Sequence, residues 1–150
     1  MNTNRNLFVV FLFSFLLASC AKEADPKLIY ERYLASIQDM HSFEDKRFEE
    51  YISNRARGVV REKTGGIKEE QLSSFLTLFK AEAVLPSDSQ VTLKKADQQT
   101  AILSITANNY PEQGSKQKSH IDFIRENGWK IDKIIIETSN GDFNYKSTTY

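Results

Sequence analysis

The sequence predicts an α+β domain in which three N-terminal helices pack on a curved four-stranded antiparallel sheet. Three observations lead to this fold class. Apolar residues recur at helical spacing between about residues 25 and 83. From Gln90 onward, apolar and polar residues alternate with the period of a half-buried strand. The pair Asn127-Gly128 separates the last two alternating segments and is typical of a tight hairpin turn. Helices first and a meander last indicate the α+β class.

The three helices are expected at about residues 25–40, 43–62 and 67–83. Asp25 can accept hydrogen bonds from the first amides of its helix, and Pro26 suits the first helical position. In the second helix acidic residues come early and basic residues late. This order favours a solvated helix that complements its dipole, with an anion-binding patch as the alternative. The residues expected to share one side of each helix are Ile29, Tyr30, Tyr33, Leu34, Ile37 and Met40, then Phe48, Tyr51, Ile52, Arg55 and Val59, then Leu72, Phe75, Leu76, Phe79 and Ala83.

Four strands are expected at Gln90–Lys95, Thr100–Tyr110, Lys116–Arg125 and Trp129–Ser139. With residues 25–139 assigned to the domain, residues 140–150 form a C-terminal tail. This tail is rich in Asn, Ser, Thr and Tyr, and it is either frayed or a short edge strand.

The register of the last hairpin depends on the length of its turn. A two-residue turn pairs Ile124 with Ile131, Asp122 with Lys133, and Ile121 with Ile134. Two apolar pairs and one pair of opposite charges favour this register. It also places Phe123 opposite Asp132, which is unfavourable, so a longer loop is the alternative.

The first residues of the chain are unlike the rest. Arg5 is the only charged residue before Cys20, and the segment from Leu7 to Leu17 is apolar apart from Ser14. As a helix this segment would be about 16 Å long, roughly half of a bilayer's hydrocarbon core. A basic start, an apolar middle and small residues at the end are typical of a secretory signal.

The sequence Leu17-Ala18-Ser19-Cys20 resembles the bacterial lipobox, the signal for lipoprotein processing. The resemblance implies cleavage between Ser19 and Cys20 and lipidation of the Cys20 sulfur. Residues 1–19 are then the signal peptide and residues 20–24 a lipidated tether. Ala21 after the cysteine implies sorting to the outer membrane of a Gram-negative source. The alternative is an ordinary signal peptide that happens to contain a cysteine.

A second resemblance covers residues 25–139. Its strongest part is Ser119–Ile134, with the run Arg125-Glu126-Asn127-Gly128-Trp129-Lys130-Ile131-Asp132 at its centre. This segment is similar to the nuclear transport factor 2-like (cystatin-like, cone-shaped) superfamily, and among its members to small bacterial lipoproteins of unknown function. The resemblance implies a curved sheet around the helices, with a pocket inside the cone. Relatives include ligand-binding domains, dimerisation modules, and isomerases or dehydratases, so the fold implies no single function.

Two sets of residues are candidates for the site. His120 and Asp122 lie two positions apart on a predicted strand and share a face, so they could perform acid–base chemistry in a pocket. The alternative is a polar, exposed face. Aromatic residues on the helices and the last strand are expected in the core, and would also line a ligand cleft: Tyr30, Tyr33, Tyr51, Phe75 and Trp129.

Composition narrows the function classes. The formal net charge is zero, which argues against a strongly basic nucleic-acid binder. One cysteine excludes an intramolecular disulfide, and two histidines exclude a His-rich metal site, so no cofactor or metal is expected.

Three functions follow as hypotheses. The first is a non-enzymatic, lipid-anchored bacterial lipoprotein facing the periplasm, which binds a small apolar ligand or an envelope protein partner. An immunity-type lipoprotein is one variety of this hypothesis. The second is a pocket enzyme, with isomerase- or dehydratase-like acid–base chemistry that uses His120 and Asp122. The third is a structural or dimerisation module, in which the chain forms a homodimer.

Overall fold

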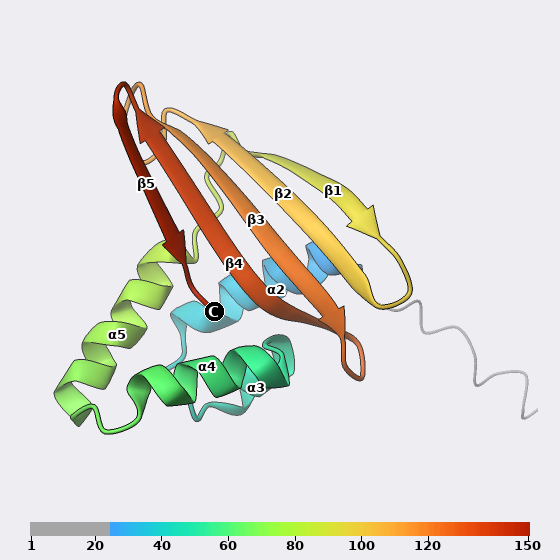
Figure 1. The fold of residues 1–150 in the computed structure, drawn as a ribbon, viewed down its shortest axis with the longest axis vertical. Helices are drawn as coiled ribbons and strands as arrows, with labels where there is room; N and C mark the ends of the chain where they lie inside the picture. The colour runs from blue at the N-terminus through green and yellow to red at the C-terminus, as the bar shows by residue number, and fades with distance from the viewer. Residues whose placement is uncertain (1–24) are drawn as a thin grey trace, which may run out of the picture.

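The computed structural model describes residues 25–150, so the predicted signal peptide, Cys20 and the tether lie outside the described residues. Four helices come first (Figure 1): α2 at Pro26–Gln38, α3 at Lys46–Tyr51, α4 at Asn54–Thr64 and α5 at Glu69–Glu82. Five strands follow: β1 at Gln90–Ala96, β2 at Thr100–Asn108, β3 at Lys116–Arg125, β4 at Trp129–Asn140 and β5 at Phe143–Thr148. The α+β class is confirmed, with one more helix and one more strand than the sequence predicts. The cone shape stays a prediction.

The strands form one antiparallel sheet in the order β1-β2-β3-β4-β5. One face of the sheet packs against the helices, and the other carries no helix of the described chain (Figure 1). The buried face holds the alternate residues Ala101, Leu103 and Ile105 of β2 and Ile121 and Phe123 of β3. They join Tyr33, Ile37 and Met40 of the helical layer in one core. The alternation seen in the sequence therefore separates a core face from a solvent face.

The predicted helix at 43–62 is wrong, because the chain leaves helical geometry at Ile52. Ile52 is extended, with φ −104° and ψ 137°, and forms a parallel bridge with Ile131 of β4. Ser53 then donates its amide to the Ile131 carbonyl over 2.9 Å. Its hydroxyl accepts the Ala56 amide over 3.0 Å and so caps α4. The short extended segment thus covers the edge of β4 where β5 does not reach.

This break also changes which residues of α4 face the core. Ala56 and Val60 are buried, whereas Arg55 is exposed and Val59 is half-buried. The prediction that Arg55 and Val59 share one side of a single helix with Phe48 and Tyr51 is therefore corrected. A continuous helix would keep one apolar stripe, but a new helix begins at its own cap and sets its own phase.

The last hairpin has the longer loop, which was the alternative to a two-residue turn. Arg125 pairs with Trp129 across a three-residue connection, in which Asn127 and Gly128 take φ values of 51° and 109°. Phe123 consequently pairs with Ile131, and Ile124 pairs with Lys130 rather than with Ile131.

Asp132 is the extra residue of a β-bulge, because Phe123 pairs with Ile131 and Asp122 with Lys133. The bulge restores the predicted pairs of Asp122 with Lys133 and of Ile121 with Ile134. The loop and the bulge together keep Phe123 beside an apolar partner and release Asp132 from the ladder.

Residues 140–150 contain an edge strand rather than a frayed tail. β5 pairs with the second half of β4, from Ile135 opposite Thr148 to Asn140 opposite Phe143. Beyond it, Thr149 donates its amide to the Ile134 carbonyl over 2.9 Å, and Tyr150 is buried in the core. The segment assigned to a tail is therefore part of the folded domain.

The β1–β2 turn predicts a measurable pH dependence. Asp97 accepts hydrogen bonds from the amides of Gln99 and Thr100 over 2.9 and 2.7 Å, and it pairs with Lys95. These contacts, the two amides first, hold the pKa of Asp97 well below its usual range. The unfolded chain therefore binds this proton more tightly than the folded chain does. The stabilisation by Asp97 is complete above its unfolded pKa of about 4, and it is lost as the pH falls toward the folded pKa.

We expect the urea concentration at the denaturation midpoint to decrease as the pH is lowered from about 5 to about 2. The decrease should be less steep in Asp97→Asn. The measurement is a series of urea titrations across this range. Asp88→Asn, in the exposed loop before β1, is the matched control and should keep the slope of the unmodified protein. Equal slopes in all three proteins would contradict the role assigned to Asp97.

Candidate functional site

The aromatic residues predicted to line a cleft lie in packed core. Tyr30, Tyr33, Tyr51 and Trp129 are each at most 7% exposed, and Phe75 is half-buried against Phe43 and Phe79. The Tyr33 hydroxyl lies 2.9 Å from the Tyr150 hydroxyl. Burial raises the pKa of Tyr30 and Tyr33, which keeps both hydroxyls protonated. These five residues line none of the four cavities described below.

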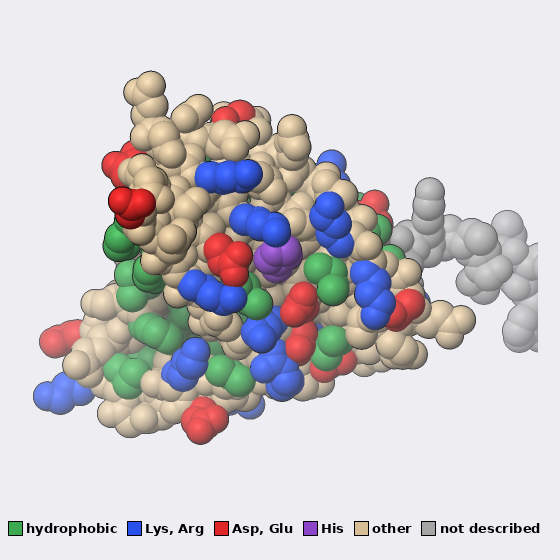
Figure 2. Space-filling view, turned by 45° about the horizontal axis from the view of Figure 1, so that its top comes forward, with side chains coloured by type: hydrophobic (Ala, Val, Ile, Leu, Met, Phe, Trp, Pro, Cys, Tyr) green, Lys and Arg blue, Asp and Glu red, His purple; other side chains and the backbone are tan. Residues whose placement is uncertain are grey.

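His120 and Asp122 lie on the face of the sheet that is turned away from the helices. We call this the open face; on β3 it consists of Lys116, Lys118, His120, Asp122 and Ile124, and it continues through their cross-strand partners. His120 lies between Ser104 and Ile135, and Asp122 between Ile102 and Lys133. Figure 2 shows a histidine on this face among lysine, arginine and acidic side chains. Neither residue lines the four cavities, so their placement gives the acid–base hypothesis no support.

One end of the open face carries a groove of about 390 Å³ across β3, β4 and β5. We call it the lysine groove; it is lined by Lys116, Lys118, Glu137, Thr138, Ser139, Asn144, Tyr145 and Lys146. Lys118, Glu137 and Lys146 form one row across the three strands. Lys146 binds Glu137 over 2.8 Å. Lys146 is the main cause of the lowered pKa of Glu137, with smaller contributions from His120 and Lys118. Three lysines and one carboxylate leave the groove with a charge of +2.

A second cavity lies on the helix side of the same end of the sheet. This end cavity has a volume of about 340 Å³ and lies between the last turn of α5, the loop after β2 and the strands β4 and β5. Its apolar lining includes Ala81, Tyr110, Pro111, Ile136 and Phe143. Tyr145 lines both this cavity and the lysine groove. The lining of the end cavity also holds the carboxylates of Glu82 and Glu112. The edge strand β5 therefore has a cavity of mixed apolar and acidic lining on one side and a basic groove on the other.

Two further cavities lie within the helical layer. The larger, of about 800 Å³, lies between the loop after α2, the end of α4 and the face of α5, and includes His41, Arg61 and Leu72. The smaller, of about 60 Å³, lies around Arg57, which pairs with Glu49 over 2.9 Å. His41 lies in the connection between α2 and α3.

The residues around β5 could not be identified as a site from the sequence alone. Lys116 and Lys118 were visible as an alternating pair, but only the pairing of β4 with β5 brings Lys146 and Tyr145 beside them. Within residues 25–150 no three His, Cys, Asp or Glu side chains are grouped so that they could hold a metal ion. No helix of the described chain has the length and apolar character needed to cross a bilayer.

Comparison with protein-family models finds no match to this chain, and searches of curated proteins and of solved structures also find none. The likeness to the nuclear transport factor 2-like superfamily therefore remains a prediction from the sequence.

Proposed function

We propose that the protein is a non-enzymatic bacterial lipoprotein, anchored through Cys20, that binds an envelope protein partner on its surface. The observation that supports surface binding is the contrast between the interior and the edge of the sheet. The aromatic residues that could have lined an interior pocket lie in or against the packed core, whereas two cavities open at the β5 edge. This contrast favours a protein partner over a small apolar ligand held inside the domain.

The anchor rests on the sequence Leu17-Ala18-Ser19-Cys20. A lipid-modified Cys20 would hold the domain close to the bilayer, because the tether of residues 20–24 would span only about 17 Å when fully extended. Each buried methylene of an acyl chain contributes about 0.8 kcal/mol, so several chains on one residue give lasting attachment. In a Gram-negative source, we place the protein at the outer membrane, facing the periplasm.

Replacement of Cys20 by alanine is expected to abolish lipid modification and to remove the protein from the membrane fraction of cells lysed without detergent. The measurement combines labelling with a radioactive fatty acid and fractionation of lysed cells. Ser19→Ala is the matched control, because it keeps a small residue before the cysteine and should remain labelled. Labelling or membrane attachment of Cys20→Ala equal to that of the unmodified protein would contradict the anchor.

The choice of a protein partner over a small ligand is tested by native mass spectrometry of the protein extracted from membranes in mild detergent. We expect a complex with a second protein and a domain free of bound apolar molecules. A small apolar molecule that stays bound to the isolated chain, with no protein complex, would instead support the alternative of a ligand-binding lipoprotein.

A further inference from the structure

The two outer strands of the sheet differ in how their free edges are protected. In the described chain, β1 and β5 are the outermost strands. β1 contains a bulge between Leu93 and Lys95, and it carries lysines at positions 94 and 95. A bulge and edge lysines are devices that prevent another strand from pairing with an edge. β5 has no bulge, because its register with β4 is continuous, and Lys146 is its one charged residue.

The exposed aromatic residues of the sheet lie on β5. Phe143 is 66% exposed and Tyr145 is 52% exposed. In Figure 1, β5 is the outermost strand on its side of the sheet, and α5 approaches this strand only near the C-terminal end of β5. Glu82 of α5 accepts hydrogen bonds there from Ser147 and Thr149, over 2.8 and 3.0 Å. The first half of β5 therefore presents its backbone and its aromatic side chains without cover from the described chain.

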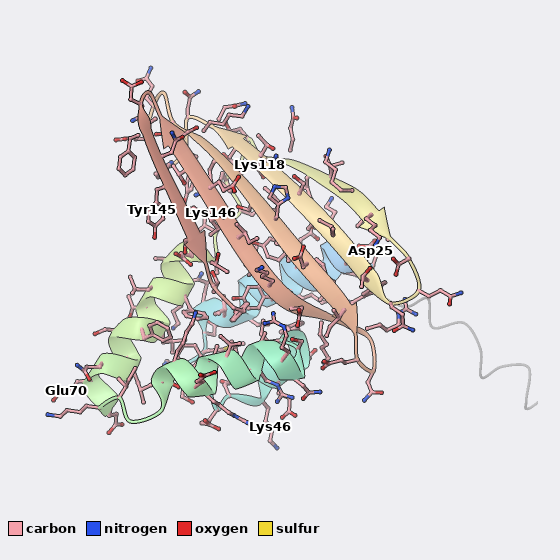
Figure 3. The ribbon with its side chains drawn as sticks, viewed as in Figure 1. Asp25, Lys46, Glu70, Lys118, Tyr145 and Lys146 are labelled. Atoms are coloured by element: carbon pink, nitrogen blue, oxygen red, sulfur yellow. The ribbon has the colours of Figure 1, made fainter. Side chains whose placement is uncertain are left out.

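Side chains alternate between the two cavities along β5. Phe143 and Tyr145 pair with Asn140 and Thr138 and border the end cavity, whereas Asn144 and Lys146 border the lysine groove. Figure 3 shows Lys118, Tyr145 and Lys146 in the same part of the sheet. A strand added beside β5 would continue this alternation, because successive side chains of a strand point to opposite faces. One set of its side chains would lie beside Phe143 and Tyr145 at the end cavity, and the other beside the lysine groove.

We propose that the β5 edge binds an extended segment of the partner protein in which apolar and acidic residues alternate. The proposal rests on the proposed function and assigns it a surface. The backbone of the segment would pair with the uncovered part of β5, from Phe143 to Lys146. Its apolar side chains would pack near Phe143 and Tyr145, and its carboxylates would face the lysine groove. In strand addition, main-chain hydrogen bonds provide affinity and flanking pockets provide specificity.

The charge of the lysine groove selects the occupant. A second copy of this chain, paired through its own β5, would bring another Lys146 to an edge whose groove already has a charge of +2. Like charges placed side by side on neighbouring strands destabilise their pairing. Acidic side chains would instead be attracted by Lys146, and at longer range by Lys116 and Lys118. The edge therefore favours an acidic segment over a second copy.

The test uses the full chain purified from membranes in detergent and two fluorescent peptides of about eight residues. One peptide alternates valine with glutamate, and the other alternates valine with lysine. We expect the glutamate peptide to bind at least about tenfold more tightly, and added salt to weaken it. Hydrogen–deuterium exchange should slow between Phe143 and Lys146 when this peptide is bound, because its strand would protect the amides of that edge.

Matched variants locate the interaction. The double variant Lys116→Gln/Lys118→Gln should weaken binding of the glutamate peptide about fivefold, because it neutralises the groove without touching the ion pair of Lys146 with Glu137. The control Lys94→Gln/Lys95→Gln removes the same charge from the opposite edge and should bind within about twofold of the unmodified protein.

Three results would overturn the proposal: no saturable binding of the glutamate peptide, exchange protection in β1 instead of β5, or a dimer whose β5 amides are protected without peptide. Failure of the proposed function would look different. If native mass spectrometry shows a partner complex but the peptide does not bind, only the proposal of the β5 edge is rejected. If the peptide binds but the chain has neither lipid nor partner, only the proposed function is rejected.

Discussion

Replacement of Tyr150 by alanine is expected to lower the free energy of unfolding by about 3–5 kcal/mol. The Tyr150 side chain is 4% exposed, and its ring lies 5.5 Å from the ring of Phe79 and 6.3 Å from that of Phe48. These partners come from α5 and α3, so the ring joins the helical layer to the end of the sheet. Truncation would leave a cavity among them and would free the segment that follows β5.

The hydroxyl group of Tyr150 provides a second, separable effect. It lies 2.9 Å from the Tyr33 hydroxyl, and burial raises the pKa of both phenols, so they remain protonated and share one hydrogen bond. Tyr150→Phe keeps the ring but leaves the Tyr33 hydroxyl without this partner, at a cost of about 1–3 kcal/mol. The double variant Tyr33→Phe/Tyr150→Phe removes both hydroxyls and is expected to cost less than the sum of the single variants.

Both effects are measured by urea denaturation, followed through the fluorescence of the one tryptophan of the chain, Trp129. Tyr145→Ala, which removes the same side chain from an exposed position on the neighbouring strand, is the control and should change stability by less than about 0.5 kcal/mol. A loss at Tyr150 as small as that of the control would mean that the end of the chain does not pack in the core.

Elements with one clear period and a clear start were predicted well from the sequence. Asp25 does cap α2, since its carboxylate accepts the Leu28 amide over 2.9 Å. The four predicted strands agree with the structure to within two residues at their ends. In each of these elements a local signal and a long-range packing partner require the same conformation, and no competing structure is available.

The elements that the sequence missed depend on contacts between distant segments. Ile52 fits the apolar stripe of a continuous helix and also fits an extended bridge, and only its pairing with Ile131 decides between them. β5 has few apolar residues that alternate, and it forms because the second half of β4 offers it an edge. The lysine groove could not be predicted for the same reason, because it exists only after β5 has paired.

Replacement of Asp132 by alanine is the second large effect that we expect, a loss of about 2–3 kcal/mol in the free energy of unfolding. The bulge releases Asp132 from the strand ladder, and its carboxylate binds the segment between α3 and α4. It accepts the Ser53 hydroxyl over 2.5 Å and the Arg55 guanidinium over 2.9 Å. Arg55 also donates to the Asp132 carbonyl. These contacts join the helical layer to β4 at the point where Ile52 pairs with Ile131.

Most of this loss should come from Ser53 rather than from Arg55. The Ser53 side chain is fully buried, so its hydroxyl would lose its acceptor in a place that water does not readily reach. The Arg55 side chain is 49% exposed and can be solvated after its partner is removed. Accordingly, Arg55→Ala should cost less than about 1 kcal/mol, and Asp132→Asn, which keeps an acceptor oxygen, should cost less than Asp132→Ala.

Urea denaturation of the unmodified protein and these three variants shows whether the buried hydrogen bond or the ion pair is the more important part of this contact. If the carboxylate acts mainly as the acceptor for the buried hydroxyl, the loss in the free energy of unfolding is smallest for Arg55→Ala, larger for Asp132→Asn and largest for Asp132→Ala. Glu137→Ala breaks an exposed ion pair on the same strand and controls for the loss of a negative charge. It should lower the midpoint only slightly, and less than Asp132→Ala does. A cost for Arg55→Ala equal to that of Asp132→Ala would show instead that the ion pair, and not the buried hydroxyl, joins the helices to the bulge.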